Sequence, residues 1–183
     1  RGGENVVNRP VKLLLAAAVL LVLAAVVFFL WARMRPLAAY AAAGRRALAK
    51  AGLEKARIPS AAGEQSYFRG GSGPAVVLVH GAGDQASAWS LVAPKLLPGR
   101  TLVVPDLAGH GASAPEAGPI SLPTLLAGLS AVLDAAAPAG KVTIVGNSLG
   151  AWLACFWAKE HPERVERLVL VNGGPLKHAA EGI

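Results

Sequence analysis

Gly146-Asn147-Ser148-Leu149-Gly150 is the stretch of this sequence that decides the fold. An apolar, strand-like run over residues 142–145 leads into it, and a helix-like run leaves it near Ala151. A G-x-S-x-G pattern between a strand and a helix is typical of a nucleophile elbow, a sharp turn that exposes a serine hydroxyl. Small residues two positions before and after the serine let the strand and the helix pack closely. The pattern therefore predicts Ser148 as a nucleophile at the start of a helix.

The start of the predicted helix is also a place where negative charge on a bound substrate would be stabilised. Free backbone N–H groups and the helix dipole favour negative charge that develops on a substrate bound beside Ser148. A second glycine-containing loop, His80-Gly81-Ala82-Gly83, follows the apolar run 75–79. Its glycines allow the backbone to turn N–H groups toward a reacting carbonyl oxygen. The two loops together predict a site for an acyl group.

The apolar runs indicate a parallel sheet. Continuous apolar strands, which are typical of strands buried on both faces, are expected over 75–79, 101–104, 142–145 and 168–171. Helical stretches are expected between them near 86–97, 122–137 and 149–161, and a short edge strand is expected over 66–69. This alternation predicts an α/β fold with right-handed crossovers. Ligands bind at the carboxyl ends of the strands in such sheets, where both loops lie.

A third motif, Asp106-Leu107-Ala108-Gly109-His110-Gly111 followed by Ser113, comes after the run 101–104. In this order on these strands, the three motifs resemble the α/β-hydrolase superfamily, in the branch of small esterases, lipases and carbon–carbon bond hydrolases. The resemblance covers about residues 66–176. It implies Ser148 as nucleophile, the backbone N–H groups of Ala82 and Leu149 as the oxyanion hole, and the Asp106 loop as a support for the site.

The first 65 residues have the composition of a membrane attachment. Residues 13–31 are an uncharged apolar run of nineteen residues, and a helix of that length spans the roughly 30 Å hydrocarbon core of a bilayer. A signal peptide cleaved near Ala41-Ala42-Ala43 is the alternative, but signal cores are usually shorter. We predict a tail over 1–12, a transmembrane helix over 13–31, a basic juxtamembrane helix or linker over 32–65, and the N-terminal part of a hydrolase domain over 66–183.

Basic residues concentrate in the same N-terminal segment. The chain has a formal net charge of +7, yet residues 58–183 contain eight Lys/Arg against nine acidic residues. Residues 1–57 contain ten Lys/Arg against two acidic residues, which favours contact with membrane lipid and argues against nucleic acid as a partner. The basic, Ala-rich residues 37–56 indicate a helix at the membrane surface or a solvated helical linker. The positive-inside rule leans toward a cytoplasmic domain.

A serine nucleophile needs a general base, and in this superfamily the chain order is Ser, then Asp or Glu, then His. After Ser148 the histidines are His161, expected at the far end of the nucleophile helix, and His178, where a lid usually begins. We therefore expect an N-terminal fragment that lacks the triad acid and histidine and is inactive alone.

The expected whole protein is a membrane-anchored serine hydrolase acting on an ester-type substrate: a carboxylic ester, with a lipid ester or a thioester as further options. It forms an acyl-enzyme on Ser148 and needs no cofactor or metal. The alternatives are an acyltransferase or carbon–carbon bond hydrolase of the same fold, and a non-catalytic chain that keeps only the fold.

Overall fold

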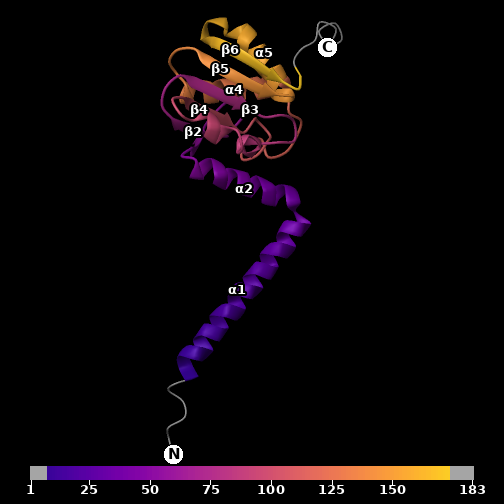
Figure 1. Ribbon diagram of the computed structural model, residues 1–183. Helices are drawn as coiled ribbons and strands as arrows, with labels where there is room; N and C mark the ends of the chain where they lie inside the picture. Colours follow the sequence, from indigo (N-terminus) through magenta and orange to yellow (C-terminus); the bar gives the residue numbers. More distant parts are fainter. Residues whose placement is uncertain (1–7, 174–183) are drawn as a thin grey trace, which may run out of the picture. The chain divides into compact units, whose positions relative to one another are not determined.

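The computed structural model describes residues 8–173, and the chain divides into two compact units between Tyr40 and Ala41. The first unit contains helix α1 (Asn8–Met34), which includes the apolar run (Figure 1). Its segment Pro10–Trp31 is long and apolar enough to cross a membrane, with a mean hydropathy of 3.2 and no residue buried. A membrane anchor and a signal sequence share these properties, so the transmembrane span stays a prediction.

The second unit is built on a six-stranded sheet with the order β1-β2-β4-β3-β5-β6 (Figure 1). β3, β4, β5 and β6 run parallel, while β1 and β2 are antiparallel to their neighbours. The strand bounds are β1 Glu54–Ile58, β2 Gln65–Gly71, β3 Ala75–Val79, β4 Thr101–Pro105, β5 Val142–Asn147 and β6 Val165–Val171. The sheet is thus mixed but mostly parallel, as the continuous apolar runs predicted.

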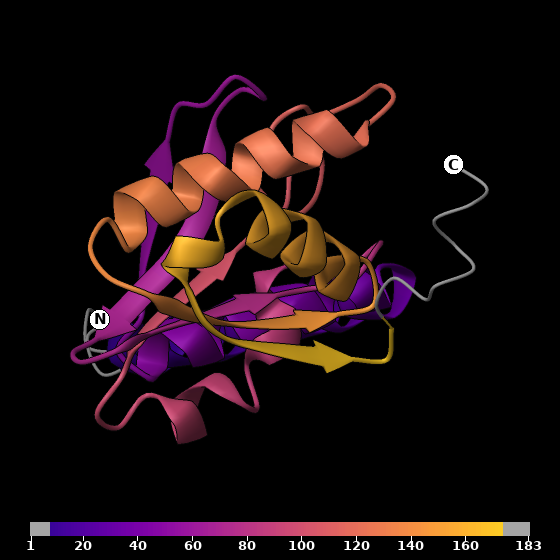
Figure 2. The same cartoon turned by 90° about the horizontal axis from the view of Figure 1, so that it is seen from above.

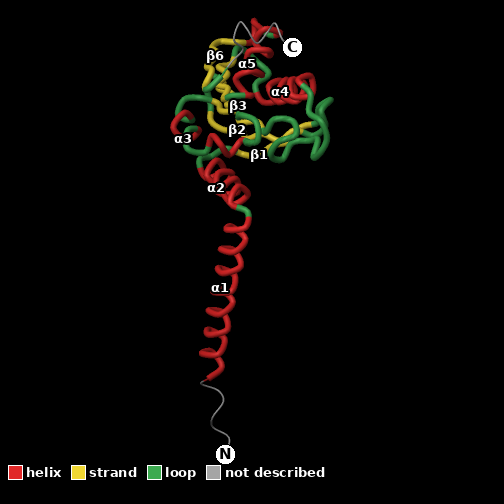
Figure 3. Tube along the Cα trace, turned by 90° about the vertical axis from the view of Figure 1, so that its right-hand side faces the viewer, coloured by secondary structure: helices red, strands yellow, loops and turns green. Residues whose placement is uncertain are grey.

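Helices cover both faces of the sheet, as Figure 2 shows from above. One face packs against α4 (Leu122–Ala136) and α5 (Leu149–Glu160), with Leu129, Leu133 and Trp157 in its core. The other face packs against η1 (Ala86–Trp89), α3 (Ala93–Leu96) and the C-terminal part of α2 (Pro36–Lys50). In Figure 3, α3 and α4 lie on opposite sides of the strands. The result is a three-layer α/β arrangement.

The structure corrects the prediction of a juxtamembrane helix or linker over residues 32–65, because part of this segment belongs to the sheet. The helix ends at Lys50, and residues 54–58 form strand β1, so β2 is not an edge strand. The helix ends where Gly52, at φ 96°, lets its own N–H bond to Ala49 and that of Leu53 bond to Leu48. This pattern is a Schellman motif, and both of its leucines are buried. Gly52 followed by the apolar Leu53 is the sequence pattern that indicates this C-terminal end of α2.

The prediction of one helix over 86–97 is also wrong, because this segment forms two short helices, η1 and α3. Pro94 lies in the first turn of α3. In the middle of a longer helix it would remove one hydrogen bond and clash with the preceding turn. Proline is tolerated in a first turn, where the missing N–H has no partner inside the helix.

Candidate active site

Ser148 occupies the sharp turn between β5 and α5, with φ 52° and ψ −115°. A positive φ is rare for a residue with a side chain, so the surroundings must impose it. A Cβ atom at Gly146 would overlap the Gly150 carbonyl oxygen, and one at Gly150 would overlap the Val79 carbonyl oxygen. The two glycines therefore let β5, α5 and β3 meet closely enough to hold the turn. The serine side chain is exposed at the head of α5.

The His80–Gly83 loop lies directly against this turn. A Cβ at Gly81 would be 3.3 Å from the Ser148 Cβ and 3.3 Å from the Asn147 carbonyl oxygen. Ala82 is exposed beside it. Neither the Ala82 N–H nor the Leu149 N–H, at the first position of α5, donates to another of the described residues 8–173. Both predicted oxyanion donors thus come from loops that meet at Ser148 and remain available to an acyl oxygen.

A hollow of about 390 Å³ opens beside the serine. Ser148, Leu149 and Trp152 line it from α5, and Asn172 and Gly173 line it from the end of β6. Leu149 and Trp152 supply an apolar wall suited to an apolar part of a substrate. Sequence reasoning did not assign Trp152 to this site, although a residue four positions after Ser148 lies on the same face of the helix.

An amide pair ties the ends of two strands at this hollow. The Asn172 Nδ2 donates to the Asn147 Oδ1 over 3.1 Å, and the Ser148 N–H donates to the Val171 carbonyl over 2.9 Å. Asn172 has φ 53°, a conformation that asparagine tolerates better than most residues. Local sequence predicts no role for either asparagine, because their contact joins two residues that are 25 positions apart in the chain.

His80 is a buried brace between the loops after β3 and β4. Its side chain is fully buried, its Nε2 accepts from the Leu107 N–H at 2.9 Å, and its Nδ1 lies 2.8 Å from the Gly81 carbonyl. Because one ring nitrogen accepts and the other donates, the ring is a neutral imidazole. Burial lowers the pKa of His80 below its ordinary value of 6.5. With both nitrogens occupied, His80 has a structural role beside Ser148.

The lowered pKa of His80 predicts acid sensitivity. Below about pH 6.5 the unfolded state binds a proton at His80 that the folded state does not, so acidification favours unfolding. We expect the free energy of unfolding to fall with decreasing pH in this range, by at most about 1.4 kcal/mol per pH unit from this group. Well above pH 6.5, His80 is neutral in both the folded and the unfolded state, so it does not change the free energy of unfolding with pH. Denaturant titrations of the full-length protein in detergent at several pH values measure the slope.

His80→Gln should flatten this slope, whereas His161→Gln, at the half-exposed end of α5, is the matched control. A slope that is unchanged in His80→Gln would assign the acid sensitivity to other groups.

The Asp106 loop is held by hydrogen bonds to neighbouring segments of the domain. The buried carboxylate of Asp106 accepts from the Ala86 N–H at 2.8 Å and from the Ala112 N–H at 3.0 Å. Ser113 donates to the Asp106 carbonyl at 2.7 Å and accepts from the Ser66 N–H at 2.8 Å. These bonds connect the end of β4 to the start of η1 and to β2. Asp106 is therefore a link between loops.

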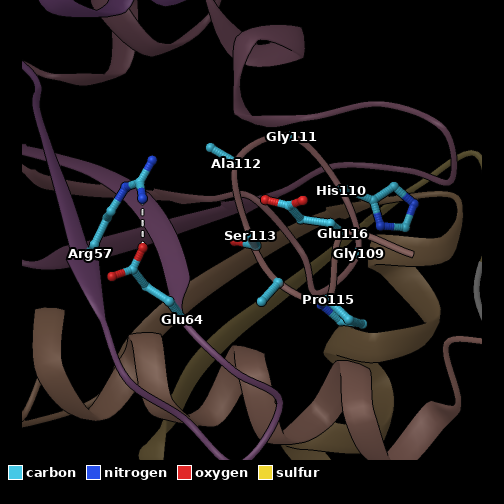
Figure 4. A pocket seen from close by; sticks show the side chains of 10 residues that line it. Arg57, Glu64, Gly109, His110, Gly111, Ala112, Ser113, Pro115 and Glu116 are labelled. Carbon is cyan, nitrogen blue, oxygen red and sulfur yellow. Dashed lines mark hydrogen bonds and ion pairs between the residues drawn. The ribbon is translucent and has the colours of Figure 1, made fainter. Parts of the chain in front are cut away.

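A larger cavity of about 440 Å³ lies at the other side of the same loop (Figure 4). Residues 109–116, including His110, line it together with Arg57 and Glu64, which form an ion pair at 2.6 Å. Figure 4 shows this pair across the cavity from His110. Ser148, the predicted nucleophile, does not line this cavity.

The described histidines do not bond to Ser148. His110 Nδ1 lies 3.0 Å from the Ala108 carbonyl, and His161 packs against Trp157 at the opposite end of α5 from the serine. His178 lies outside the described residues. Within residues 8–173, the predicted nucleophile and the predicted oxyanion donors are thus brought together without a hydrogen-bonded histidine at Ser148.

Comparisons with curated proteins identify hydrolase relatives. An uncharacterized protein of Mycobacterium tuberculosis is 41% identical over 116 residues, covering 61% of this chain and 33% of that protein. The 2-hydroxy-6-oxo-2,4-heptadienoate hydrolase of Pseudomonas putida is 38% identical over 106 residues, covering 56% of this chain and 38% of that protein. The chain therefore spans 33% and 38% of the lengths of these two relatives.

Solved structures give the same fold. A lipase from Acinetobacter baumannii matches with a TM-score of 0.67 and 29% identity, over 75% of this chain and 48% of that one. A membrane phospholipase A matches with a TM-score of 0.64 and 30% identity, over 87% of this chain and 51% of that one. The sequence profile of the alpha/beta hydrolase fold family matches residues 74–182, which is more than half of the chain. This chain belongs to the α/β-hydrolase fold family.

Proposed function

We propose that the protein is a membrane-anchored serine hydrolase that cleaves carboxylic esters through an acyl-enzyme on Ser148. The observation that carries the proposal is the conformation of Ser148, held at positive φ between two glycines at the head of α5. A strained, exposed serine beside two N–H groups that have no partner within residues 8–173 costs stability and suits acyl transfer. The same features give a purely structural protein no evident benefit.

The reaction divides into two acyl transfers. The Ser148 Oγ attacks the ester carbonyl carbon as a general base takes its proton, and the negative oxygen accepts from the Leu149 and Ala82 N–H groups. Collapse of this intermediate breaks the bond to the alcohol, which leaves with the proton, and the acyl group stays on Ser148. Water then attacks the acyl carbonyl and releases the acid and the serine. The proposal requires the general base to come from outside residues 8–173.

Lipid esters are the proposed substrate class. The hollow beside Ser148 has an apolar wall of Leu149 and Trp152, which suits an acyl chain. The membrane phospholipase A match covers more of this chain than residues 41–183 make up, so it extends into the N-terminal segment. This extension supports both the proposed anchor and a lipid substrate.

Hydrolysis of a carbon–carbon bond is the second candidate, favoured by the 38% identity to the Pseudomonas putida hydrolase. A panel of acyl esters and vinylogous diketones, assayed on the full-length protein, separates the two candidates. Faster turnover of the diketones would favour the carbon–carbon reaction.

A fluorophosphonate probe tests the nucleophile directly. We expect the probe to label the full-length protein at the peptide that contains Ser148, because a serine with an adjacent base and an oxyanion hole reacts selectively. Ser72→Ala, at an exposed serine in the turn after β2, is the matched control and should keep the label. Label on a different peptide would place the nucleophile elsewhere.

The anchor predicts that residues 13–31 remain in the mature protein. Alkaline carbonate strips peripheral proteins but leaves a transmembrane helix in the bilayer, because the buried apolar surface does not depend on charge. We expect the protein in the pellet after extraction. N-terminal sequencing that finds a soluble mature form starting near Gly44 would establish a cleaved signal peptide instead.

A further inference from the structure

Charge is segregated between the two faces of the sheet. The segments 41–53 and 80–100, which contain the helices on one face, carry five Lys/Arg and one acidic residue, Asp84. The segment 121–171, which contains the helices on the other face, carries four Lys/Arg and four acidic residues. The near-neutral total of the domain therefore conceals one strongly basic face. We call it the α2–η1–α3 face.

The basic residues of this face are available to an outside partner. Arg46, Lys50, Lys95 and Arg100 are exposed, and none of them forms an ion pair within residues 8–173. Arg45 is half-buried and donates to the Gln85 side chain at 2.5 Å, so its charge also has no acidic partner there. Uncompensated cations on one face attract an anionic surface.

Two large apolar side chains project from the same face. Leu91 and Val92 join η1 to α3 and are 76% and 41% exposed, respectively. Lys95 follows within one helical turn. Exposed apolar residues amid cations are typical of a surface that enters the interface of an anionic bilayer.

We propose that the α2–η1–α3 face docks on an anionic phospholipid bilayer, with Leu91 and Val92 in the headgroup interface. The cations lie over the headgroups, and the apolar pair contributes the hydrophobic part of the binding. Helix α2 does not insert by itself, because Ala41, Gly44 and Leu48 on its apolar side are buried in the domain. The docking unit is therefore the folded face and not a free amphipathic helix.

The short segment between the apolar run and the domain supports a bilayer as the partner of the α2–η1–α3 face. This step rests on the proposed anchor. Nine residues lie between Trp31, at the end of the apolar run, and Ala41, where the domain unit begins. Even a fully extended chain of that length spans only about 35 Å, so the start of the domain stays within about 35 Å of the end of the anchor. Because the anchor keeps the domain near the bilayer, docking loses less translational entropy than binding of a protein from solution does.

The test uses the full-length protein in lipid nanodiscs with a nitroxide label at position 91, introduced as Leu91→Cys together with Cys155→Ser. In nanodiscs containing phosphatidylglycerol, we expect the label to be protected from a water-soluble relaxation agent. In phosphatidylcholine nanodiscs it should stay accessible. Neutralising Arg46, Lys50 and Lys95 to Gln should lower the docked-to-undocked ratio on the order of 100-fold, at about fivefold per cation.

The controls place the same probe and charge changes on the opposite face. A label at exposed Ala135 in α4 should be equally accessible in both lipids, and Lys159→Gln, at an exposed lysine in α5, should leave protection at position 91 unchanged. Equal accessibility of position 91 in both lipids overturns the proposal. Protection that depends on the number of chains per nanodisc, or on added nucleic acid, also overturns it, in favour of a second copy or a nucleic acid. Carbonate extraction tests the anchor separately, so an anchored but undocked protein contradicts only this inference.

Discussion

Ser148→Ala is expected to abolish ester hydrolysis by the full-length protein while leaving its folding intact. Removing the nucleophile of a serine hydrolase lowers kcat on the order of 10⁶-fold, and the residual rate comes from the oxyanion donors and substrate binding. KM should change little, because the hydroxyl contributes mainly to the transition state. The side chain is exposed, so its loss leaves no buried cavity. Steady-state kinetics and circular dichroism of the same preparations measure both effects.

Two controls make this result specific to the elbow. Ser72→Ala, at an exposed serine outside the site, should retain wild-type kcat. Ala82→Val should slow turnover more than it changes substrate binding, because a bulkier side chain in the His80–Gly83 loop displaces a donor that acts in the transition state. Ester turnover by Ser148→Ala within tenfold of wild type would exclude an acyl-enzyme on this residue.

Gly150→Ala is expected to destabilise the domain by about 3 kcal/mol or more. The added methyl group would overlap the Val79 carbonyl oxygen and lie 2.6 Å from the His80 carbonyl oxygen. Both are backbone atoms at the end of the central strand β3, so neither can rotate away as a side chain would. The helix must move outward, which also releases the turn that holds Ser148. Denaturant titration should show the loss, and fluorophosphonate labelling should fall with it.

Gly140→Ala separates this steric effect from the general cost of replacing glycine. Gly140 has φ 77° and open space around its Cβ position, so its replacement by alanine carries only conformational strain, about 1–2 kcal/mol. Labelling at Ser148 should survive in that variant. A Gly150→Ala protein as stable as wild type would show that β3 and α5 are not in the close contact on which the elbow depends.

The strands and the elbow were predictable because their signals are local. A continuous apolar run such as 75–79 indicates a strand buried on both faces, and the spacing of Gly146 and Gly150 around Ser148 follows from the sterics of one turn. Strand β1 was missed because Glu54–Ile58 is short, charged and next to an Ala-rich helix. Its strand conformation depends on pairing with β2, a partner that periodicity alone does not identify.

The sequence by itself determined the four parallel strands, the two helices before and after the strand that leads to Ser148, the family resemblance, the turn that bears Ser148 and the apolar segment 13–31. Each of these depends on residues within a few positions of one another. Only the tertiary structure decided what surrounds the serine: the His80–Gly83 loop against the turn, Asn172 bonded to Asn147, and Trp152 at the hollow. It also gathered Lys50, Lys95 and Leu91 on one face. These contacts join strands and helices distant in sequence, and sheet order and layer packing set them.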